Sequence, residues 1–260
     1  MIGSSRSRSA RDRPQPLTEL AFFSDVHGNA AALRTVLSDL ASRGIERVFC
    51  LGDLVGYGPD PNGVIDAIRA ADVTSILGNY DDGIAFDRGD CGCYYADAAA
   101  RRIGDASYAF TAATVTPEHK TWLRGLPREL RVELRAAAAA FRLHLFHGSP
   151  RRINEYLHSD RDERTYRRLA AQADADVLLF GHTHTPWHRE YDGVLFVNVG
   201  SAGRPKDGDV RAVYTVLRLE EGRPPGVEVK RVAYDVEETA RGVLAAGLPA
   251  ELAEAFRRGA

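Results

Sequence analysis

Six short apolar runs, each followed directly by a turn rich in Gly, Asp, Asn or His, restrict the folds that this chain can adopt. Each run is four residues long and rich in residue types that favour β-structure. A short apolar run bounded by turn residues is consistent with a buried strand. We therefore predict six buried strands at Leu20 to Phe23, Val48 to Leu51, Thr74 to Leu77, Leu143 to Phe146, Val177 to Phe180 and Val194 to Val197.

Helical patterns separate the first three runs. Four apolar residues recur at helical spacing and form one stripe that Gly44 can terminate: Leu33, Val36, Leu37 and Leu40. A second aliphatic face follows Pro61, a residue favoured in the first turn of a helix. Alternation of strand and helix favours parallel strands joined by right-handed crossovers, and therefore an α/β fold.

Two regions alternate polar and apolar residues, which is typical of β-hairpins. The first pairs residues 131–135 with 141–146, and the second pairs 212–219 with 227–233. The chain ends in helical patterns at 236–244 and 249–256. These patterns add antiparallel strands to the parallel core, so we expect mixed sheets.

The domain organisation expected from the sequence is simple. Residues 1–16 are rich in Ser and Arg and contain two prolines, which predicts a disordered N-terminal tail. Residues 17–260 are expected to form one domain. The segment from about 83 to 130 breaks the strand and helix rhythm and is predicted to be a helical insertion, with helices after Tyr94 and from Thr116. Insertions at the mouth of a site often determine specificity.

Composition excludes several classes of protein. Lys and Arg number 34 and Asp and Glu number 36, which gives a net charge of −2 and no basic surface for wrapping nucleic acid. No apolar run approaches the roughly 20 residues that a bilayer requires. The odd number of cysteines, Cys50, Cys91 and Cys93, favours a reducing compartment, and we expect a cytoplasmic protein. The Cys-Gly-Cys triplet has no second cysteine cluster and is interpreted as a loop.

Potential metal ligands follow five of the predicted strands. The sequences at these strand ends are Ser-Asp-Val-His at 24–27, Gly-Asp at 52–53, Gly-Asn-Tyr-Asp at 78–81, His-Gly-Ser at 147–149 and Gly-His-Thr-His at 181–184. The carboxyl ends of strands border the binding crevice of an open α/β sheet, so we expect these ends to converge. The i and i+2 spacing of two of the pairs predicts extended backbone with both side chains on one side.

The donor set indicates a centre with two metal ions. It comprises Asp25, His27, Asp53, Asn79, His147, His182 and His184. Seven oxygen and nitrogen donors exceed the needs of one four-coordinate ion but suit two ions that share a carboxylate. Imidazole donors favour manganese, iron, zinc, cobalt or nickel over a magnesium or calcium site.

The five motifs, in this order between Leu20 and Gly203, resemble those of the calcineurin-like metallophosphoesterases. The Gly-Tyr-Gly-Pro turn at 56–59 and the helical tail are most similar to small bacterial phosphodiesterases of that superfamily. The resemblance implies a four-layer αββα sandwich, in which two mixed β-sheets are flanked by helices. This architecture agrees with the strand, helix and hairpin patterns described above.

The resemblance also implies roles for the donors. One divalent ion would be held by Asp25, His27, Asp53 and His184, and the other by Asp53, Asn79, His147 and His182. Asp53 would bridge the two ions. Manganese is the first expectation, with iron, zinc, nickel and cobalt as alternatives. Two ions about 3.5–4 Å apart would activate a bridging hydroxide for attack on the phosphorus of a small phosphate ester.

Tyr80 departs from the family pattern, in which a His after Gly-Asn protonates the leaving group. A phenol with a pKa of about 10 is poorly matched to proton transfer at neutral pH. This substitution favours a phosphodiester, and three other histidines could supply the acid: His119, His158 and His188. We place Asp53, Asn79, Tyr80 and Asp81 among the candidate catalytic residues, with Tyr80 packing beside the ions or contacting substrate and Asp81 orienting a neighbour.

Two arginines are candidates for binding the phosphate of the substrate, Arg151 and Arg204. Each has a second cation nearby in the sequence, Arg152 beside Arg151 and Lys206 close to Arg204. The substrate itself would be a small phosphate ester, with a nucleotide as one candidate. A serine/threonine protein phosphatase, a dinucleoside polyphosphate hydrolase and a non-catalytic scaffold are the alternatives. Tyr80 disfavours the protein phosphatase, and the complete donor set disfavours the scaffold. The sequence does not distinguish a monomer from a homo-oligomer.

Overall fold

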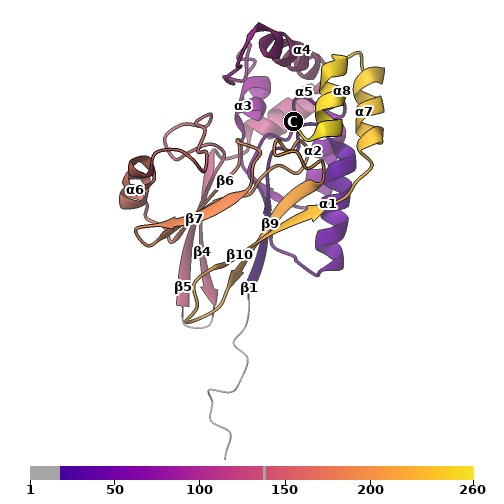
Figure 1. The fold of residues 1–260 in the computed structure, drawn as a ribbon. Helices are drawn as coiled ribbons and strands as arrows, with labels where there is room; N and C mark the ends of the chain where they lie inside the picture. Colours follow the sequence, from indigo (N-terminus) through magenta and orange to yellow (C-terminus); the bar gives the residue numbers. More distant parts are fainter. Residues whose placement is uncertain (1–17, 137–138) are drawn as a thin grey trace, which may run out of the picture.

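The computed structural model describes residues 18–136 and 139–260, so the tail expected at 1–16 lies outside the described residues. Two five-stranded mixed sheets pack face to face, with helices on the outer face of each (Figure 1). The strand orders are β10-β9-β1-β2-β3 and β4-β5-β6-β8-β7. The prediction of an αββα sandwich is confirmed.

The first sheet has a parallel centre and an antiparallel hairpin. Its parallel strands are β1 (Thr18–Phe23), β2 (Val48–Cys50) and β3 (Thr74–Ser75), joined by helices α1 (Ala30–Ser42) and α2 (Pro61–Ala70). The predicted hairpin is formed by β9 (Ala212–Leu219) and β10 (Gly226–Val232), and β9 pairs antiparallel with β1. The side chains of Asn29 and Asp60 cap the two helices, which fixes where each begins.

The second sheet contains the other predicted hairpin, β4 (Glu129–Ala136) and β5 (Ala139–Phe146). Strands β6 (Val177–Phe180) and β8 (Val194–Asn198) continue it in parallel. The edge strand β7 (Trp187–Tyr191) and helices α3 (Asn79–Ala85) and α6 (Glu163–Gln172) were not expected from the sequence. The three central residues of β7 are polar and exposed, so no apolar run marks this strand.

Successive side chains of the central strands point to opposite faces of their sheet, and this alternation creates the separate packing layers of the core. In β1, Ala21 and Phe23 pack under the helices of the first sheet, whereas Leu20 and Phe22 pack between the two sheets. In β6, side chains at 177 and 179 lie between the sheets, and those at 178 and 180 lie under α6. Both faces of these strands are therefore buried, which explains why their sequences are continuously apolar.

The remaining helices gather at one end of the molecule (Figure 1). Helices α4 (Ala98–Thr114) and α5 (Pro117–Arg124) form the predicted insertion, and α7 (Val236–Ala245) and α8 (Ala250–Arg258) form the predicted C-terminal tail. A cluster of buried apolar side chains joins α7 and α8 to Tyr57, Tyr80 and Cys91. The insertion and the tail thus support the loops that follow the first sheet.

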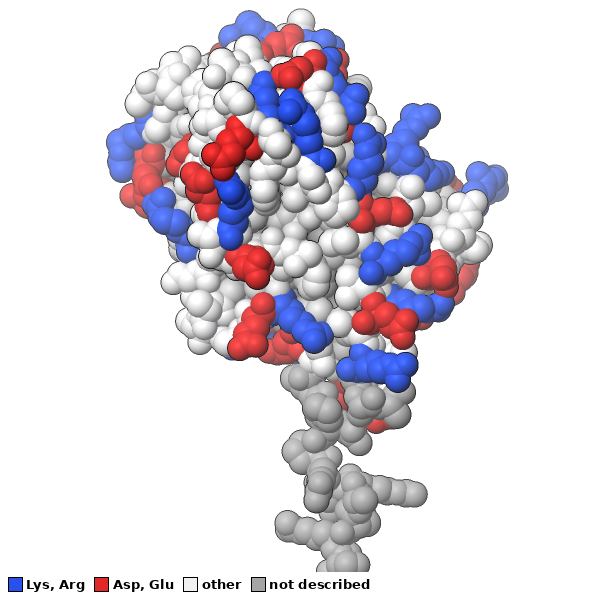
Figure 2. Space-filling model, turned by 180° about the vertical axis from the view of Figure 1, so that it is seen from behind, with Lys and Arg blue, Asp and Glu red and all other residues white. Residues whose placement is uncertain are grey.

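The surface carries charges of both signs. Figure 2 shows Lys and Arg interspersed with Asp and Glu over the face opposite to that of Figure 1. Across residues 18–136 and 139–260, none of the helices has the length and apolarity needed to cross a membrane.

The layered packing makes the contact between the sheets essential for stability. Phe22 is fully buried there and stacks on Phe49, with 5.2 Å between ring centroids. Phe22→Ala is expected to lower the free energy of unfolding by about 3–5 kcal/mol because it leaves a cavity between the sheets. Phe86→Ala, at a side chain that is 44% exposed, serves as the control and should change it by less than about 0.5 kcal/mol. Urea titration measures both variants, and equal effects would contradict this packing.

Candidate metal centre

The five predicted strand ends meet at one place. Backbone hydrogen bonds link the loop after β1 to the loop after β2, from Asp25 N to Gly52 O at 2.9 Å and from His27 N to Asp53 O at 3.0 Å. Gly181 N donates to His147 O at 2.9 Å, and this bond links the loops after β6 and β5. All seven predicted ligands are buried, with at most 3% of any of them exposed. The predicted convergence is confirmed.

The ligand side chains form two groups. One group comprises Asp25, His27 and His184, and the other comprises Asp53, His147 and His182. Within each group the potential ligand atoms all lie within 4.8 Å of one another. The Oδ2 atom of Asp53 also lies 3.7 Å from His27 Nε2 and 3.3 Å from His147 Nε2, so this carboxylate lies between the two groups.

The backbone of these loops differs from the expectation of extended pairs. Asp25 and His27 have φ values of 55° and 49°, and His182 and His184 have values of 66° and 61°. Asp25 and His27 enter the same ligand group, whereas His182 and His184 enter different groups. Non-glycine residues rarely adopt the left-handed conformation that these φ values describe, and it is concentrated at functional sites. Spacing alone could not reveal it.

Three histidines present the same ring nitrogen to the centre. The Nδ1 atoms of His27, His147 and His184 lie 3.0, 2.7 and 2.5 Å from the backbone carbonyls of residues 55, 51 and 204. Because a carbonyl only accepts, each Nδ1 carries a proton, and each Nε2 points into the centre. A metal-binding His has this arrangement, in which its other N–H donates to a carbonyl.

The histidine ring nitrogens in the centre lie close together in two pairs. His27 Nε2 and His184 Nε2 are 3.1 Å apart, and His147 Nε2 lies 3.2 Å from His182 Nδ1. Burial lowers the pKa of His27 to about 3, and it lowers the pKa of His184 well below its usual range. The first pair is therefore neutral, and two lone pairs meet without a proton between them. A cation at this position removes the repulsion.

Further donor atoms lack partners. Among the described residues, Asp25 Oδ1, Asn79 Oδ1 and His182 Nε2 are buried and form no hydrogen bond. The amide of Asn79 is oriented by the carbonyl of Cys91, which accepts from Nδ2 at 2.9 Å and leaves Oδ1 directed elsewhere. Buried polar atoms are almost always satisfied, so unsatisfied atoms in one centre indicate a ligand. The residues present fit divalent metal ions.

The electrostatics of the centre also favour cations. Burial, and to a smaller extent the nearby Asp53 carboxylate, raises the pKa of the Asp25 carboxyl to about 7. Burial disfavours charge on His147, but Asp53 and Asp25 outweigh it and raise the pKa of this imidazole to about 10. A proton on His147 thus partly neutralises two buried carboxylates. Divalent ions would neutralise them more completely.

Asp81 holds the loops together. Its Oδ1 accepts from the backbone N–H of Leu54 at 2.9 Å and of Val55 at 3.2 Å, and its Oδ2 accepts from Gly78 N at 3.0 Å. These bonds join the loop that carries Asp53 to the start of α3. The position agrees with the expected orienting role and not with direct contact to substrate.

Tyr80 does not occupy the position of a catalytic acid. Its side chain is fully buried, and its hydroxyl lies 3.2 Å from Ser107 Oγ of α4. Its ring packs edge-on against His27, with 5.6 Å between centroids. Of the two roles considered for Tyr80, these contacts correspond to packing beside the centre.

The three alternative acids lie in different surroundings. His119 is buried in α5 and bound to Asn62 and Asp66 at 2.7 and 3.0 Å. His188 is exposed on the edge strand β7. His158 is the one connected to the centre, because it stacks on Tyr156, which in turn stacks on His182 at 4.0 Å between centroids.

Arg204 lies beside the first ligand group. Its backbone carbonyl accepts from His184 Nδ1, and its guanidinium lies over the ring of Tyr57, 4.3 Å from the centroid. Within the part of the chain that the structure describes, its Nε is buried without a hydrogen-bond partner. An unused cationic donor at this position fits the expected contact with phosphate.

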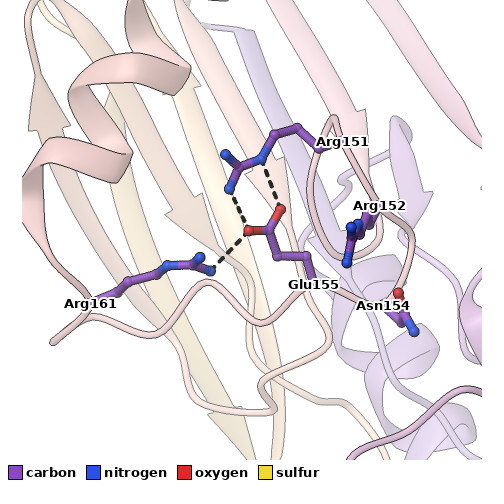
Figure 3. Close-up of a pocket in the computed structure, with 5 residues that line it drawn as sticks. All are labelled: Arg151, Arg152, Asn154, Glu155 and Arg161. Carbon is purple, nitrogen blue, oxygen red and sulfur yellow. Dashed lines mark hydrogen bonds and ion pairs between the residues drawn. The ribbon is translucent and has the colours of Figure 1, made fainter.

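Arg151 has a different environment. Figure 3 shows Arg151 and Arg161 both reaching Glu155, which neutralises part of their charge. These residues line a cavity of about 550 Å³ together with Arg152 and Asn154. A neighbouring cavity of about 370 Å³ is lined by Arg151 and by His147 of the metal centre. Arg151 is thus near the centre but already engaged in an ion pair.

Some neighbours of the centre were not identified from the sequence. Tyr57 packs edge-on against His27 at 4.9 Å, and Tyr156 stacks on His182. Cys91 and Cys93 form a disulfide within the segment that was interpreted as a loop of a protein in a reducing compartment. In the sequence, Tyr57 follows the Gly-Asp motif and Tyr156 follows the His-Gly-Ser motif, and this proximity could have identified them as neighbours of the centre. However, aromatic residues are equally typical of a hydrophobic core.

A sandwich of two mixed sheets with a buried centre of carboxylate and imidazole ligands at the strand ends defines a metal-dependent phosphoesterase. Residues 19–222 match the family model for the calcineurin-like phosphoesterase superfamily domain, and the chain belongs to this superfamily.

Relatives in other organisms support this membership. The chain is 29% identical to an uncharacterized protein of Methanocaldococcus jannaschii, over 90% of this chain and 96% of that one. It is 26% identical to the phosphodiesterase YfcE of Escherichia coli, over 74% of this chain and 84% of YfcE. The crystal structure of a metallophosphoesterase from Sphaerobacter thermophilus, 28% identical, superposes with a TM-score of 0.72 over 94% of this chain and 99% of that one.

Close backbone contact at Gly78 makes this residue a test of the geometry. A Cβ atom there would lie 2.1 Å from both the backbone N and the Oδ1 of Asp53. Gly78→Ala is therefore expected to displace Asp53 and to lower both the melting temperature and the bound metal. Gly226→Ala is the control, because its Cβ would meet nothing closer than 3.6 Å. Thermal unfolding and elemental analysis measure the two variants, and a fully metallated Gly78→Ala protein would contradict the geometry.

Proposed function

We propose that this protein is a phosphodiesterase with two divalent metal ions, and that it hydrolyses a small soluble phosphate diester. The opposed Nε2 lone pairs of His27 and His184, 3.1 Å apart in a buried site, carry this proposal. Such a pair is unfavourable without a cation between its members. The membership of the phosphoesterase superfamily and the similarity to YfcE support the reaction class.

The proposed ligand sets use the two groups of side chains. Asp25, His27 and His184 would hold one ion, and Asn79, His147 and His182 would hold the other. Asp53 would bridge them, because its Oδ2 lies near a histidine of each group. When bound, the two ions would supply Lewis acidity for the phosphoryl oxygens and acidify a water nucleophile. Manganese is the first expectation among ions that accept both imidazole and carboxylate ligands.

The side chains around the ligands have distinct parts in the proposed reaction. The carbonyls of residues 51, 55 and 204 keep the three Nδ1 atoms protonated and the rings fixed. Arg204 would bind a non-bridging phosphoryl oxygen through its unpartnered Nε. Ser149 and Ser201 act structurally, since their hydroxyls are bonded to Glu155 and to the carbonyl of Asp25.

A diester is favoured over a monoester because a strong general acid is missing at the usual position. Tyr80 is buried against Ser107, and burial raises its pKa well above the usual value. A phosphatase that acts on phosphoserine must protonate a poor alkoxide leaving group. The complete set of seven donors argues against a non-catalytic scaffold.

The first experiment compares two chromogenic substrates. Metal-stripped protein is supplied with manganese, nickel or zinc and assayed with bis-p-nitrophenyl phosphate and p-nitrophenyl phosphate. We expect turnover that requires metal and a higher kcat/KM for the diester. A preference for the monoester would contradict the diesterase assignment, and metal binding without turnover of either substrate would favour a scaffold.

The bridging role of Asp53 predicts an effect on both ions. Asp53→Asn keeps the side-chain shape but removes the negative charge, so both sites should lose metal and activity should fall by at least about a hundredfold. Asp105→Asn, at an exposed side chain of α4, should leave metal content and activity unchanged. Elemental analysis measures the metal content of both variants. Two fully occupied metal sites in Asp53→Asn would exclude the bridging role.

A further inference from the structure

A small pocket beside the metal centre is lined mainly by tyrosines. Its volume is about 210 Å³. We call it the tyrosine pocket and define it by Tyr57, Tyr94, Tyr95, Tyr156, Arg204 and Lys206. Small residues of α4, among them Ala100 and Gly104, complete its wall. A Cβ atom at Gly104 would lie 2.3 Å from the ring of Tyr95, so glycine at this position allows the tyrosine to pack against the helix.

The tyrosine pocket is in contact with both halves of the metal centre. Tyr57 packs edge-on against His27 of one ligand group, and Tyr156 stacks on His182 of the other. Arg204 lies between the pocket and the first group, with its guanidinium over Tyr57. Lys206 also lines the pocket, and burial together with the nearby Arg204 lowers the pKa of its amine to about 7. A phosphate at the metal centre would therefore have the Arg204 cation and aromatic faces next to it.

Tyr94 is unusually exposed for an aromatic residue. Its side chain is 76% exposed, which makes it the most exposed large hydrophobic residue in the part of the chain that the structure describes. Tyr94 and Tyr95 belong to the insertion and directly follow the Cys-Gly-Cys loop whose first carbonyl orients Asn79. The insertion thus brings aromatic side chains to a site whose chemistry is supplied by the strand ends.

The aromatic and cationic side chains of the tyrosine pocket favour a ligand that has a planar ring next to a phosphate. Stacking of a nucleobase on an aromatic side chain contributes about 1–3 kcal/mol of binding free energy for each base. Phenolic hydroxyls can add hydrogen bonds to atoms of the base or the sugar. The volume is below the roughly 300–1,000 Å³ of pockets that enclose drug-sized ligands, so it suits one ring system.

We propose that the tyrosine pocket binds the nucleoside group of a phosphodiester whose phosphate lies at the metal centre. This inference rests on the proposed function and adds the substrate class and the residues that select it. The nucleoside is the retained ester group, and Arg204 and Lys206 bind the phosphate that joins it to the leaving group.

The test uses two diesters with the same leaving group. Thymidine 5′-(p-nitrophenyl phosphate) and methyl p-nitrophenyl phosphate differ only in the retained ester, so the ratio of their kcat/KM values isolates recognition of the nucleoside. We expect the protein with its metal to prefer the thymidine ester by about tenfold or more, as stacking on one tyrosine predicts. Tyr94→Ala should reduce the ratio several-fold, and Tyr94→Phe should retain it because the aromatic face remains.

Several outcomes would overturn this inference without affecting the proposed function. A ratio near one, or a ratio unchanged in Tyr94→Ala, would exclude recognition of the nucleoside while hydrolysis continues. Equal slowing of both substrates by Tyr94→Ala would assign the pocket to the leaving group instead.

If neither ester is hydrolysed, the proposed function fails, and calorimetry then tests the pocket alone. Tighter binding of thymidine 5′-monophosphate than of methyl phosphate, lost in Tyr94→Ala, would support it. Equal affinities would overturn it.

Discussion

Burial of seven polar side chains in one place is the constraint on which the rest of the structure depends. Two carboxylates and four imidazoles are costly to bury unless cations and hydrogen bonds compensate them. The protein meets this requirement with backbone groups. Carbonyls orient the rings of His27, His147 and His184, and an N–H of the loop after β6 binds Asp25. The loops can only supply these groups if the strands hold them at fixed distances.

Two sheets, and not one, provide those fixed positions. The loops after β1 and β2 belong to the first sheet, and the loops after β5 and β6 belong to the second. The apolar contact between the sheets, which includes Phe22 and Leu179, therefore sets the distance between the two ligand groups. Stability and site geometry have a common origin in this contact. The left-handed backbone at Asp25, His27, Asp53, His182 and His184 is tolerated because the packed sheets support it.

The helices that cover this end of the molecule have a separate role. Tyr80 connects α3 to Ser107 of α4, and the C-terminal helices pack against the same cluster. The insertion also orients one candidate ligand, because the Cys91 carbonyl accepts from Asn79 Nδ2. It contributes Tyr94 and Tyr95 to the tyrosine pocket, whereas Tyr57, Tyr156, Arg204 and Lys206 come from other loops.

The sequence by itself determined the fold class, most strands, the hairpins and the seven candidate ligands that the fold brings together, because apolar runs and polar strand ends are local patterns. It did not reveal β7, α3 or α6, whose short or polar sequences carry weak periodicity. Only the tertiary structure decided that the paired ligands adopt left-handed backbone, that Tyr80 faces Ser107, and that Arg151 is engaged by Glu155. It alone also gathered tyrosines from distant segments into one pocket. These features depend on contacts between residues far apart in the chain, and no local pattern encodes such contacts.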